Sequence, residues 1–571
     1  MLFPYFFHNG FRMRQTTFTS LWKHYRQPLF FALFVLFSIG LGFIVTSGEI
    51  IATDDVNRIV HGQWLLSRIG LTEPTANIAK WYGPLWDIIT YSAHVSIFSF
   101  LNNPYWVMHA LTFALFPITL ALTYILLGRA GVPSSTRILI LALLFGMIRF
   151  GGHASVNVKD FPAACAYLIV TLYLWIALKD KRTTKGYDFL TLMELGIIAA
   201  IPFMIRTPNG FHLIFLTAFV FIHNYFFLPR TNLRQRIFPP VMLLVAGLCA
   251  IFILYPTWWE LSFNSLKKPF TLFSSYNWGG EIRIFGNSIF IEARETPIPW
   301  WYVFTWPPII THPLAFFVMI IGIIGSLTKE IQNKYPFKLS SKSKEFNLSL
   351  VRWIWLITIL SFAAILIIRP LLYDEERQIL FLYPLLMIIA GLGLDDLRKN
   401  WKLLIAGLIT ILSLFSYINW QRYSYTYKSP LIGDTSSQQF LGDYYMTCFA
   451  PAVRKIHESI PAGTLIVVNG PKHIVEYQIS DLRNINYPSP IPDIAEYPVS
   501  WDKPTDGSAY AVLTSNRLGW HEPVVDAIVR GEAQLIWQDF MPPGEPACIL
   551  AYFPEIQKTD KREFIKNVYG E

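Results

Sequence analysis

Residues 29–46 read LFFALFVLFSIGLGFIVT, an uncharged stretch long enough to cross the ~30 Å hydrocarbon core of a membrane. Further apolar stretches cover residues 105–127, 138–150, 161–178, 189–205, 211–228, 241–255, 302–327, 353–368, 379–394 and 403–418. Hydrophobic residues make up 53% of the 571 and charged residues only 15%, below the roughly 25% of soluble domains. The sequence therefore predicts a mainly α-helical polytopic membrane protein with about eleven transmembrane helices.

The distribution of Lys and Arg predicts the orientation. If the N-terminus is cytoplasmic, the segments that alternate onto its side carry most of the Lys and Arg between the spans. The C-terminus is then extracytoplasmic. The net charge of +9 belongs largely to this pattern, so we expect no nucleic-acid partner. The first stretch is longer than a signal-peptide core and lacks an Ala-x-Ala end, which favours an anchor.

The spacing of the stretches predicts two domains. Residues 1–418 form the multispanning domain, with long external loops at 48–104 and 256–301, and residues 419–571 form a soluble extracytoplasmic domain of α/β type. In this tail a helix is expected at 450–460 and strands at 464–469, 509–514 and 547–553. Cys448 and Cys548 lie in this domain, where a disulfide is permitted, and the pairing stays open at this point.

An acidic pair, Asp54 and Asp55, follows the first span. Apolar residues at helical spacing over 56–66 predict an amphipathic helix at the membrane interface, with the pair at its N-terminal end. The plain alternative is helix capping, since Asp is favoured at helix starts.

Polar side chains from four separated segments should meet on the outer face. They are Asp54, Asp55, Arg58 and Lys80; His153, Asn157, Lys159 and Asp160; Arg206; and Arg369, Tyr373 and Arg377. Such convergence of acids and bases predicts an active site. Simpler alternatives remain: Arg206 and Arg369 extend to head groups, and Lys159 and Asp160 form a surface ion pair. The three Asp residues are also possible ligands of a divalent metal, although we favour none.

Four motifs resemble the GT-C superfamily of polyprenyl-phosphate-sugar-dependent glycosyltransferases, which includes protein O-mannosyltransferases and the lipid A aminoarabinose transferase. They are Asp54-Asp55 with Arg58, the segment Lys80-Trp81-Tyr82-Gly83-Pro84, residues 153–162 (HASVNVKDFP), and residues 373–384 (YDEERQILFLYP). The chain departs from the family pattern in three places, with Asp55 for a common Glu, Val158 for Pro and Gln378 for His.

The resemblance implies an integral inner-membrane enzyme that transfers a sugar from a polyprenyl-phosphate donor to an acceptor at the extracytoplasmic face. Asp54 would be the catalytic base, Asp160 a second acid, and Lys80 and Arg377 ligands of the donor phosphate. Arg58, Tyr82, His153, Asn157, Lys159, Arg206, Arg369 and Tyr373 would complete the donor site. The partners would be the donor, membrane lipids, and a glycolipid, polysaccharide or protein acceptor, with no cofactor.

Two other classes of function stay open. A transporter or flippase of lipid-linked sugars would move its substrate without forming a glycosidic bond, and it would favour ionisable residues at mid-membrane. A receptor would sense an external ligand with its C-terminal domain, and its outer-loop acids would be dispensable.

Overall fold

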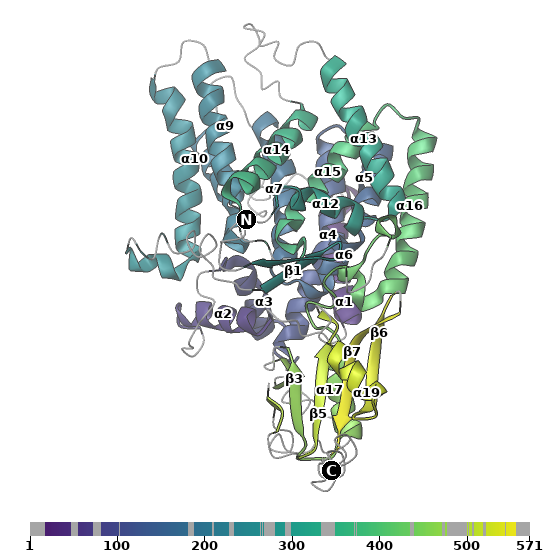
Figure 1. Ribbon diagram of the computed structural model, residues 1–571. Coiled ribbons are helices and arrows are strands. Elements are labelled where there is room, and N and C mark those ends of the chain that lie inside the picture. The colour runs from purple at the N-terminus through teal and green to yellow at the C-terminus, as the bar shows by residue number, and fades with distance from the viewer. Residues whose placement is uncertain are drawn as a thin grey trace, which may run out of the picture.

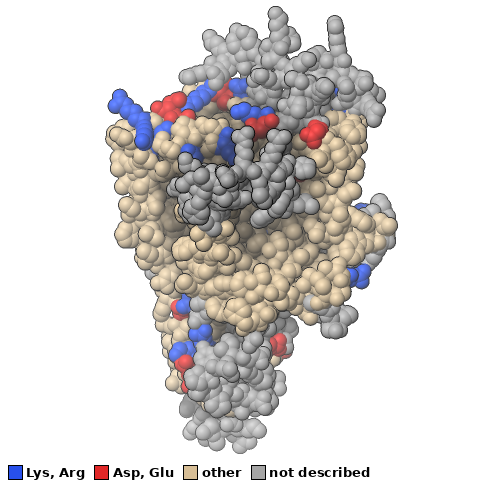
Figure 2. All heavy atoms as spheres, turned by 180° about the vertical axis from the view of Figure 1, so that it is seen from behind, with Lys and Arg blue, Asp and Glu red and all other residues tan. Residues whose placement is uncertain are grey.

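The computed structural model describes residues 18–46, 55–71, 82–101, 103–180, 188–207, 210–227, 233–262, 264, 267, 280–291, 299–332, 349–370, 372, 374–433, 439–470, 474–476, 499–500, 502–504, 508–517, 521–542 and 544–554. A bundle of long helices makes up most of the molecule, and a small sheet lies beyond one end of it (Figure 1). Figure 2 shows charged side chains towards the two ends of one face, with a broad belt between them that is nearly free of charge. Such a belt is typical of a membrane protein.

The bundle is built from helices that match the predicted apolar stretches. They are α1 (Phe18–Thr46), α4 (Pro104–Arg129), α5 (Ser134–Phe145), α6 (Ile148–Val156), α7 (Asp160–Asp180), α8 (Phe189–Ile205), α9 (Phe211–Phe227), α10 (Leu233–Leu254), α12 (Tyr302–Ile310), α13 (Pro313–Gln332), α14 (Leu350–Ile368), α15 (Tyr383–Gly393) and α16 (Lys399–Trp420). Within the described residues, six helices are long and apolar enough to cross a membrane, or seven if the bent pair α5–α6 is one span. Shorter apolar helices lie at four of the other predicted stretches. The mainly helical membrane fold is confirmed, whereas the count of eleven and the orientation stay predictions.

Helix α7 is the central helix of the bundle. In its most apolar window 83% of the residues are buried, against 22% for α16 and 28% for α10. A helix that is apolar all round is expected to be buried in this way. Because α7 begins at Asp160, the fold places a charged side chain at the end of the most buried helix.

Two of the predicted continuous spans are broken. The stretch 138–150 bends by 62° between α5 and α6, at Gly146 and Met147. A Cβ on Gly146 would lie 2.6 Å from Cβ of Ala315, so α13 packs directly on the break. The stretch 302–327 divides into α12 and α13, because Pro313 disfavours a helical conformation for the residue before it.

Two short helices, α2 (Asp55–Ser67) and α3 (Leu85–Ser96), lie across the end of the bundle that faces the sheet (Figure 1). Helix α2 confirms the helix predicted at 56–66. The two helices are in close contact, since a Cβ on Gly62 would lie 2.6 Å from Cβ of Tyr91. Helix α2 begins at Asp55, and α3 begins three residues after Tyr82.

The C-terminal part contains a five-stranded mixed sheet with the order β4-β3-β5-β7-β6. Its elements are α17 (Phe449–Ser459), β3 (Leu465–Asn469), β4 (Val499–Ser500), β5 (Tyr510–Ser515), α19 (Glu522–Val529), β6 (Gln534–Met541) and β7 (Glu545–Phe553). Strands β4, β3 and β5 are parallel, and β5, β7 and β6 are antiparallel. The predicted helix and three strands are present. The sequence did not predict β6, an edge strand with one buried residue and no apolar alternation.

Two further contacts involve the C-terminal part. One lies within it, and the other joins the chain after α16 to an external loop of the bundle. A disulfide joins Cys448 to Cys548, the pairing that the sequence left open. A hairpin of β1 (Gly280–Ile284) and β2 (Asn287–Ile291), within the predicted external loop 256–301, meets the chain after η6 (Pro430–Ile432) through a bridge between Ile284 and Phe440.

Candidate active site

Asp55 is the first residue of α2, and its carboxylate is held by a histidine on α4. Its side chain is fully buried, and Oδ2 of Asp55 lies 2.7 Å from Nε2 of His109 on α4. Asp54 precedes it directly and lies outside the described residues, as do Lys80 and Tyr373. Of the predicted acidic pair, Asp55 is therefore a carboxylate enclosed by the bundle. The sequence did not single out His109 because it lies within an apolar span.

A second carboxylate on α3 organises the next turn of α2. Oδ2 of Asp87 lies 3.1 Å from Nη1 of Arg58 and 2.6 Å from Nδ1 of His61, and all three side chains are buried. Burial lowers the pKa of His61, although the hydrogen bond with Asp87 opposes that change. Asp87 thus fixes Arg58, one of the predicted phosphate ligands. Sequence reasoning missed Asp87 and His61, which match none of the motifs.

Two cations lie close to the ring of Tyr82. The guanidinium carbon of Arg58 lies 4.4 Å from the centre of this ring, and Nζ of Lys159 lies 4.8 Å from it. Cations at these distances are attracted to the ring. The next residue, Gly83, is packed so tightly that a Cβ there would lie 2.3 Å from the carbonyl oxygen of Ile205. The glycine therefore lets the first loop approach the end of α8.

Asp160 and Arg206 form a buried ion pair between α7 and the end of α8. Asn157 orients the start of α7, because its Oδ1 accepts hydrogen bonds from the backbone N–H of Asp160 (2.8 Å) and of Lys159 (3.3 Å). Two of the simpler alternatives from the sequence are wrong. Arg206 is buried against Asp160 and does not extend to head groups, and Lys159 and Asp160 are buried and form no surface ion pair. Arg58, Tyr82, Lys159, Asp160 and Arg206 are called the Tyr82 cluster below.

A second group of charges, the Arg149 cluster, consists of Arg149, His153, Glu375 and Glu376. Arg149 on α6 forms ion pairs with both glutamates, at 2.6 Å for Glu376, and Nε2 of His153 lies 3.3 Å from Oε1 of Glu376. All four side chains are fully buried. Because Nδ2 of Asn157 lies 3.2 Å from Nδ1 of His153, a polar path runs from the start of α7 to this cluster.

The two glutamates share one arginine and titrate differently. Burial raises the pKa of Glu375 more than Arg149 lowers it. Burial also opposes ionisation of Glu376, but Arg149 and His153 outweigh it and hold the pKa of Glu376 below its usual range. Two like charges beside one cation favour a single ionised carboxylate. Within the cluster Glu376 is therefore the carboxylate that ionises more readily.

The C-terminal part contacts this region through Asp374. Its carboxylate lies 2.6 Å from Nη2 of Arg377 and 2.8 Å from Nη2 of Arg517, which follows β5. Asp374 and Glu375 both have positive φ, 55° and 62°, which is strained for residues other than glycine. Arg369, by contrast, is exposed at the end of α14, so the structure does not bring it to the buried clusters.

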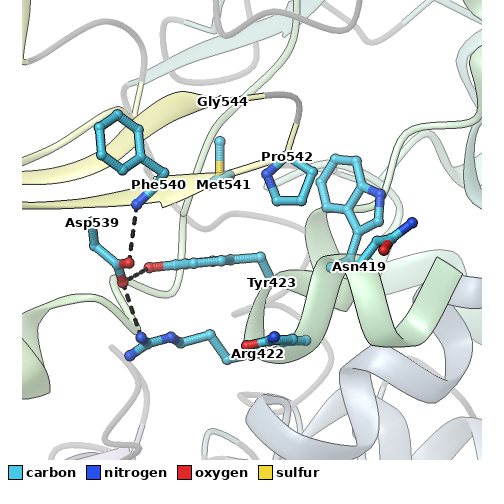
Figure 3. A pocket seen from close by; sticks show the side chains of 10 residues that line it. Asn419, Arg422, Tyr423, Asp539, Phe540, Met541, Pro542 and Gly544 are labelled. Carbon is cyan, nitrogen blue, oxygen red and sulfur yellow. Dashed lines mark hydrogen bonds and ion pairs between the residues drawn. The ribbon is translucent and has the colours of Figure 1, made fainter. Parts of the chain in front are cut away.

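Within the described part of the chain, no group of three or more His, Cys, Asp or Glu side chains could hold a metal ion. Asp54 lies outside that part, so the expectation of no metal stays a prediction. Separately from the two clusters, a cavity of about 300 Å³ lies between the end of α16 and the β6–β7 hairpin (Figure 3).

The arrangement of the helices is that of the GT-C fold, and the predicted resemblance is confirmed at the level of fold. ArnT from Cupriavidus metallidurans in the apo state has this fold, with a TM-score of 0.50, 10% identity, and coverage of 92% of this chain and 98% of that one. ArnT bound to undecaprenyl phosphate gives a TM-score of 0.45 at 11% identity over 91% and 97% of the two chains. The apo oligosaccharyltransferase of Archaeoglobus fulgidus gives 0.41 at 11% identity over 85% and 62%. No protein-family model and no curated protein sequence matches the chain.

Proposed function

We propose that this protein is an integral membrane glycosyltransferase that moves a sugar from a polyprenyl-phosphate donor to an acceptor at the extracytoplasmic face. The observation that carries the proposal is the Tyr82 cluster, in which Arg58 and Lys159 both lie over one ring and the residue after Lys159, Asp160, is a buried carboxylate. Four segments far apart in the sequence build it. The GT-C fold supports the same class of reaction, and ArnT, which has this fold, has been solved with undecaprenyl phosphate bound.

In the proposed reaction Asp54 is the general base. It takes the proton of the acceptor hydroxyl as the oxygen attacks the anomeric carbon of the donor sugar, and the bond from that carbon to the phosphate oxygen breaks. A positioned base of this kind contributes typically 10²–10⁴-fold to the rate. Asp55 has a different task, because His109 encloses its carboxylate. It holds the start of α2 and thereby positions Asp54.

The cations stabilise the departing lipid phosphate. Lys159 and Arg58 both lie over the ring of Tyr82. Lys80 and Arg377 complete the proposed phosphate site, as the motif resemblance implies. Hydrogen bonds to charged groups contribute about 1.5–3 kcal/mol each, so two or three of them would make the phosphate a competent leaving group. Arg206 joins the end of α8 to Asp160 at the start of α7, and we assign this pair to positioning.

The test is transfer of a radiolabelled sugar by purified protein in nanodiscs. The donors are a panel of synthetic polyprenyl-phosphate monosaccharides, and the acceptors are extracted membrane glycolipids, polysaccharide and protein. Labelled product from one donor class supports the proposal. Movement of the donor between leaflets with no product from any acceptor would instead identify a flippase.

A further inference from the structure

The cavity of about 300 Å³ lies where the last long helix meets the sheet. It is lined by Asn419, Trp420, Gln421 and Arg422 at the end of α16 and by Asp539 and Phe540 on β6, with Met541 and Pro542 closing one side. This volume is at the lower end of the range for small-molecule sites, which suits one small ring. Figure 3 shows Asp539 on β6 pointing towards Tyr423 and Arg422, and the ring of Phe540 on the other side of the strand.

The polar groups of this cavity are held in place and are balanced in charge. Oδ2 of Asp539 accepts a hydrogen bond from the hydroxyl of Tyr423 at 2.5 Å and lies 3.2 Å from Nη2 of Arg422. Its Oδ1 accepts the backbone N–H of Phe540 at 3.0 Å. Since Arg422 and Asp539 offset each other, the site favours an uncharged ligand rich in hydroxyl groups. Planar amide, guanidinium and carboxylate groups can donate to and accept from such hydroxyls.

Gln421 lines the cavity with a strained backbone. It has φ 42° and ψ −122°, and its side chain is exposed. Strained non-glycine residues persist where the surrounding structure holds them, and they concentrate at ligand sites. The strain therefore adds an observation that is independent of the cavity.

The surroundings of the cavity indicate a lipid-linked ligand. On α16, just before the cavity, Phe415 is 60% exposed and Ile418 55% exposed, and Phe540 on the opposite wall is 48% exposed. Helix α16 runs along the edge of the bundle down to β6 (Figure 1). An amphiphile could thus lay its chains along α16 while its head group enters the cavity.

The cavity is connected to the buried clusters by one short helix, η5 (Gln421–Thr426). A Cβ on Gly152 would lie 2.3 Å from the backbone nitrogen of Tyr425, so η5 packs directly on α6. The rings of Tyr425 and His153 are 6.3 Å apart. Arg422 and Tyr423 contact Asp539 at the cavity, and Tyr425 approaches the Arg149 cluster.

We propose that this cavity binds the uncharged sugar head group of a membrane glycolipid, with its acyl chains against α16. The cavity is then the docking site of the acceptor, and the acceptor belongs to the class of glycolipids. The role as acceptor rests on the proposed function.

The test measures retention of monoglucosyl-diacylglycerol by the full chain, using native mass spectrometry of protein in bicelles without any donor. Diacylglycerol and phosphatidylglycerol serve as comparison lipids. We expect at least tenfold more retention of the glucolipid than of either comparison lipid. Asp539→Asn and Gln421→Gly should abolish the difference, whereas Val529→Ser, an exposed position on α19, should keep it.

If Asp539→Asn fails to fold, Gln421→Gly still decides the test. This variant should fold, because glycine adopts the observed φ without strain, and it removes only the Gln421 side chain. Equal retention of all three lipids, equal retention of phosphatidylglycerol, or an unchanged glucolipid preference in Gln421→Gly would overturn the proposal. Since no donor is present, the binding result can fail while sugar transfer stands, and it can hold while transfer fails.

Discussion

His109 and Asp55 hold the start of α2 against α4, with Nε2 of the histidine 2.7 Å from Oδ2 of the carboxylate in a fully buried setting. This contact fixes the residue that directly follows Asp54. Asp55 therefore has a partner inside the bundle, and Asp54, which lies outside the described residues, is kept as the proposed base.

Asp55→Ala should lower the apparent melting temperature in detergent. It leaves His109 buried without its carboxylate partner, which costs about 1–3 kcal/mol. His109→Ala should have an effect of similar size, and the double variant should lose less than the sum, because the two residues share one interaction. Additive losses would show that the contact contributes nothing of its own.

Gly83→Ala should reduce both stability and sugar transfer. A Cβ at this position meets the backbone of Ile205 at 2.3 Å, so the first loop must move away from Arg206 and carry Tyr82 with it. The matched control is Gly407→Ala on α16, where nothing lies within 4 Å of the added Cβ. In the control the initial rate should be unchanged and the melting temperature should not fall, since alanine is the better helix former. Wild-type behaviour of Gly83→Ala would contradict the packing described for the Tyr82 cluster.

Glu375→Gln should raise stability at pH 8 relative to wild type. Burial raises the pKa of Glu375 from 4.5 to about 7, so the folded protein binds this proton more tightly than the unfolded chain. The stabilisation from Glu375 is full below the unfolded pKa and is lost as pH rises through the folded pKa. The advantage of the glutamine variant should therefore disappear near pH 5.

Glu376→Gln is the matched control, and its change in stability at pH 8 should have the opposite sign. The pKa of Glu376 is held low by Arg149 and His153 against burial, so its stabilisation is present above the unfolded pKa and is lost on acidification. This variant should be less stable than wild type at pH 8. Apparent melting temperatures between pH 5 and 8 decide both cases, and the same sign in the two variants would refute the assignment.

Several parts of this arrangement could be predicted from the sequence. Asp160 and Arg206 meet as expected, because the ends of neighbouring helices place their loops on one side. His109 and Asp87 could not be predicted, since their partners are 54 and 29 residues away and lie in no common motif. The break at Gly146 depends on the packing of Ala315, a contact from a distant helix that apolar periodicity does not contain.

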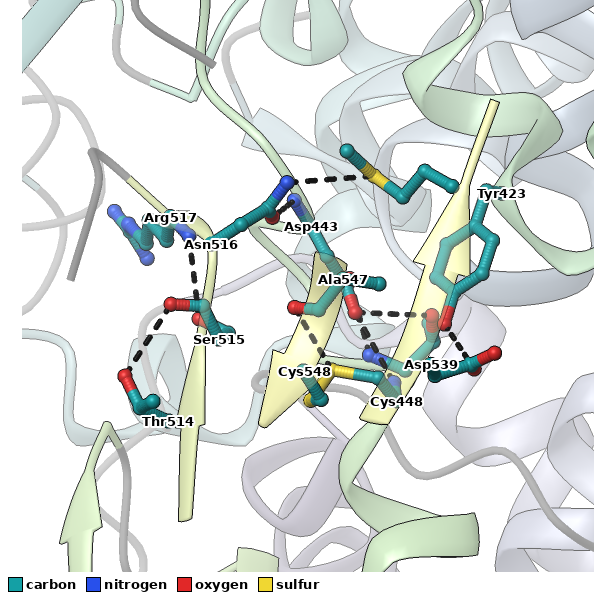
Figure 4. The surroundings of a disulfide bond; sticks show 12 residues. Tyr423, Asp443, Cys448, Thr514, Ser515, Asn516, Arg517, Asp539, Ala547 and Cys548 are labelled. Carbon is teal, nitrogen blue, oxygen red and sulfur yellow. Dashed lines mark hydrogen bonds between the residues drawn. A yellow bond between two sulfur atoms is a disulfide. The ribbon is translucent and has the colours of Figure 1, made fainter. Parts of the chain in front are cut away.

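Replacing Cys448 and Cys548 by Ala should destabilise the C-terminal part. The bond closes a separation of 100 residues, for which loop entropy alone gives about 4–5 kcal/mol. It also lies beside Asp443, which accepts the backbone N–H of Cys448 at 3.0 Å and the hydroxyl of Tyr425 (Figure 4). Limited proteolysis with and without reductant measures the change. Equal protease resistance after complete reduction, verified by thiol labelling, would count against a stabilising role.

The central claim is that Asp54 activates the acceptor at the Tyr82 cluster, and the most direct measurement is the initial rate of labelled sugar transfer by Asp54→Asn. The account predicts a fall of about 10²–10⁴-fold at an unchanged melting temperature. Asp55→Asn, by comparison, should lower the melting temperature as well as the rate. Full transfer by Asp54→Asn, with the same donor and acceptor that wild type uses, would contradict the account.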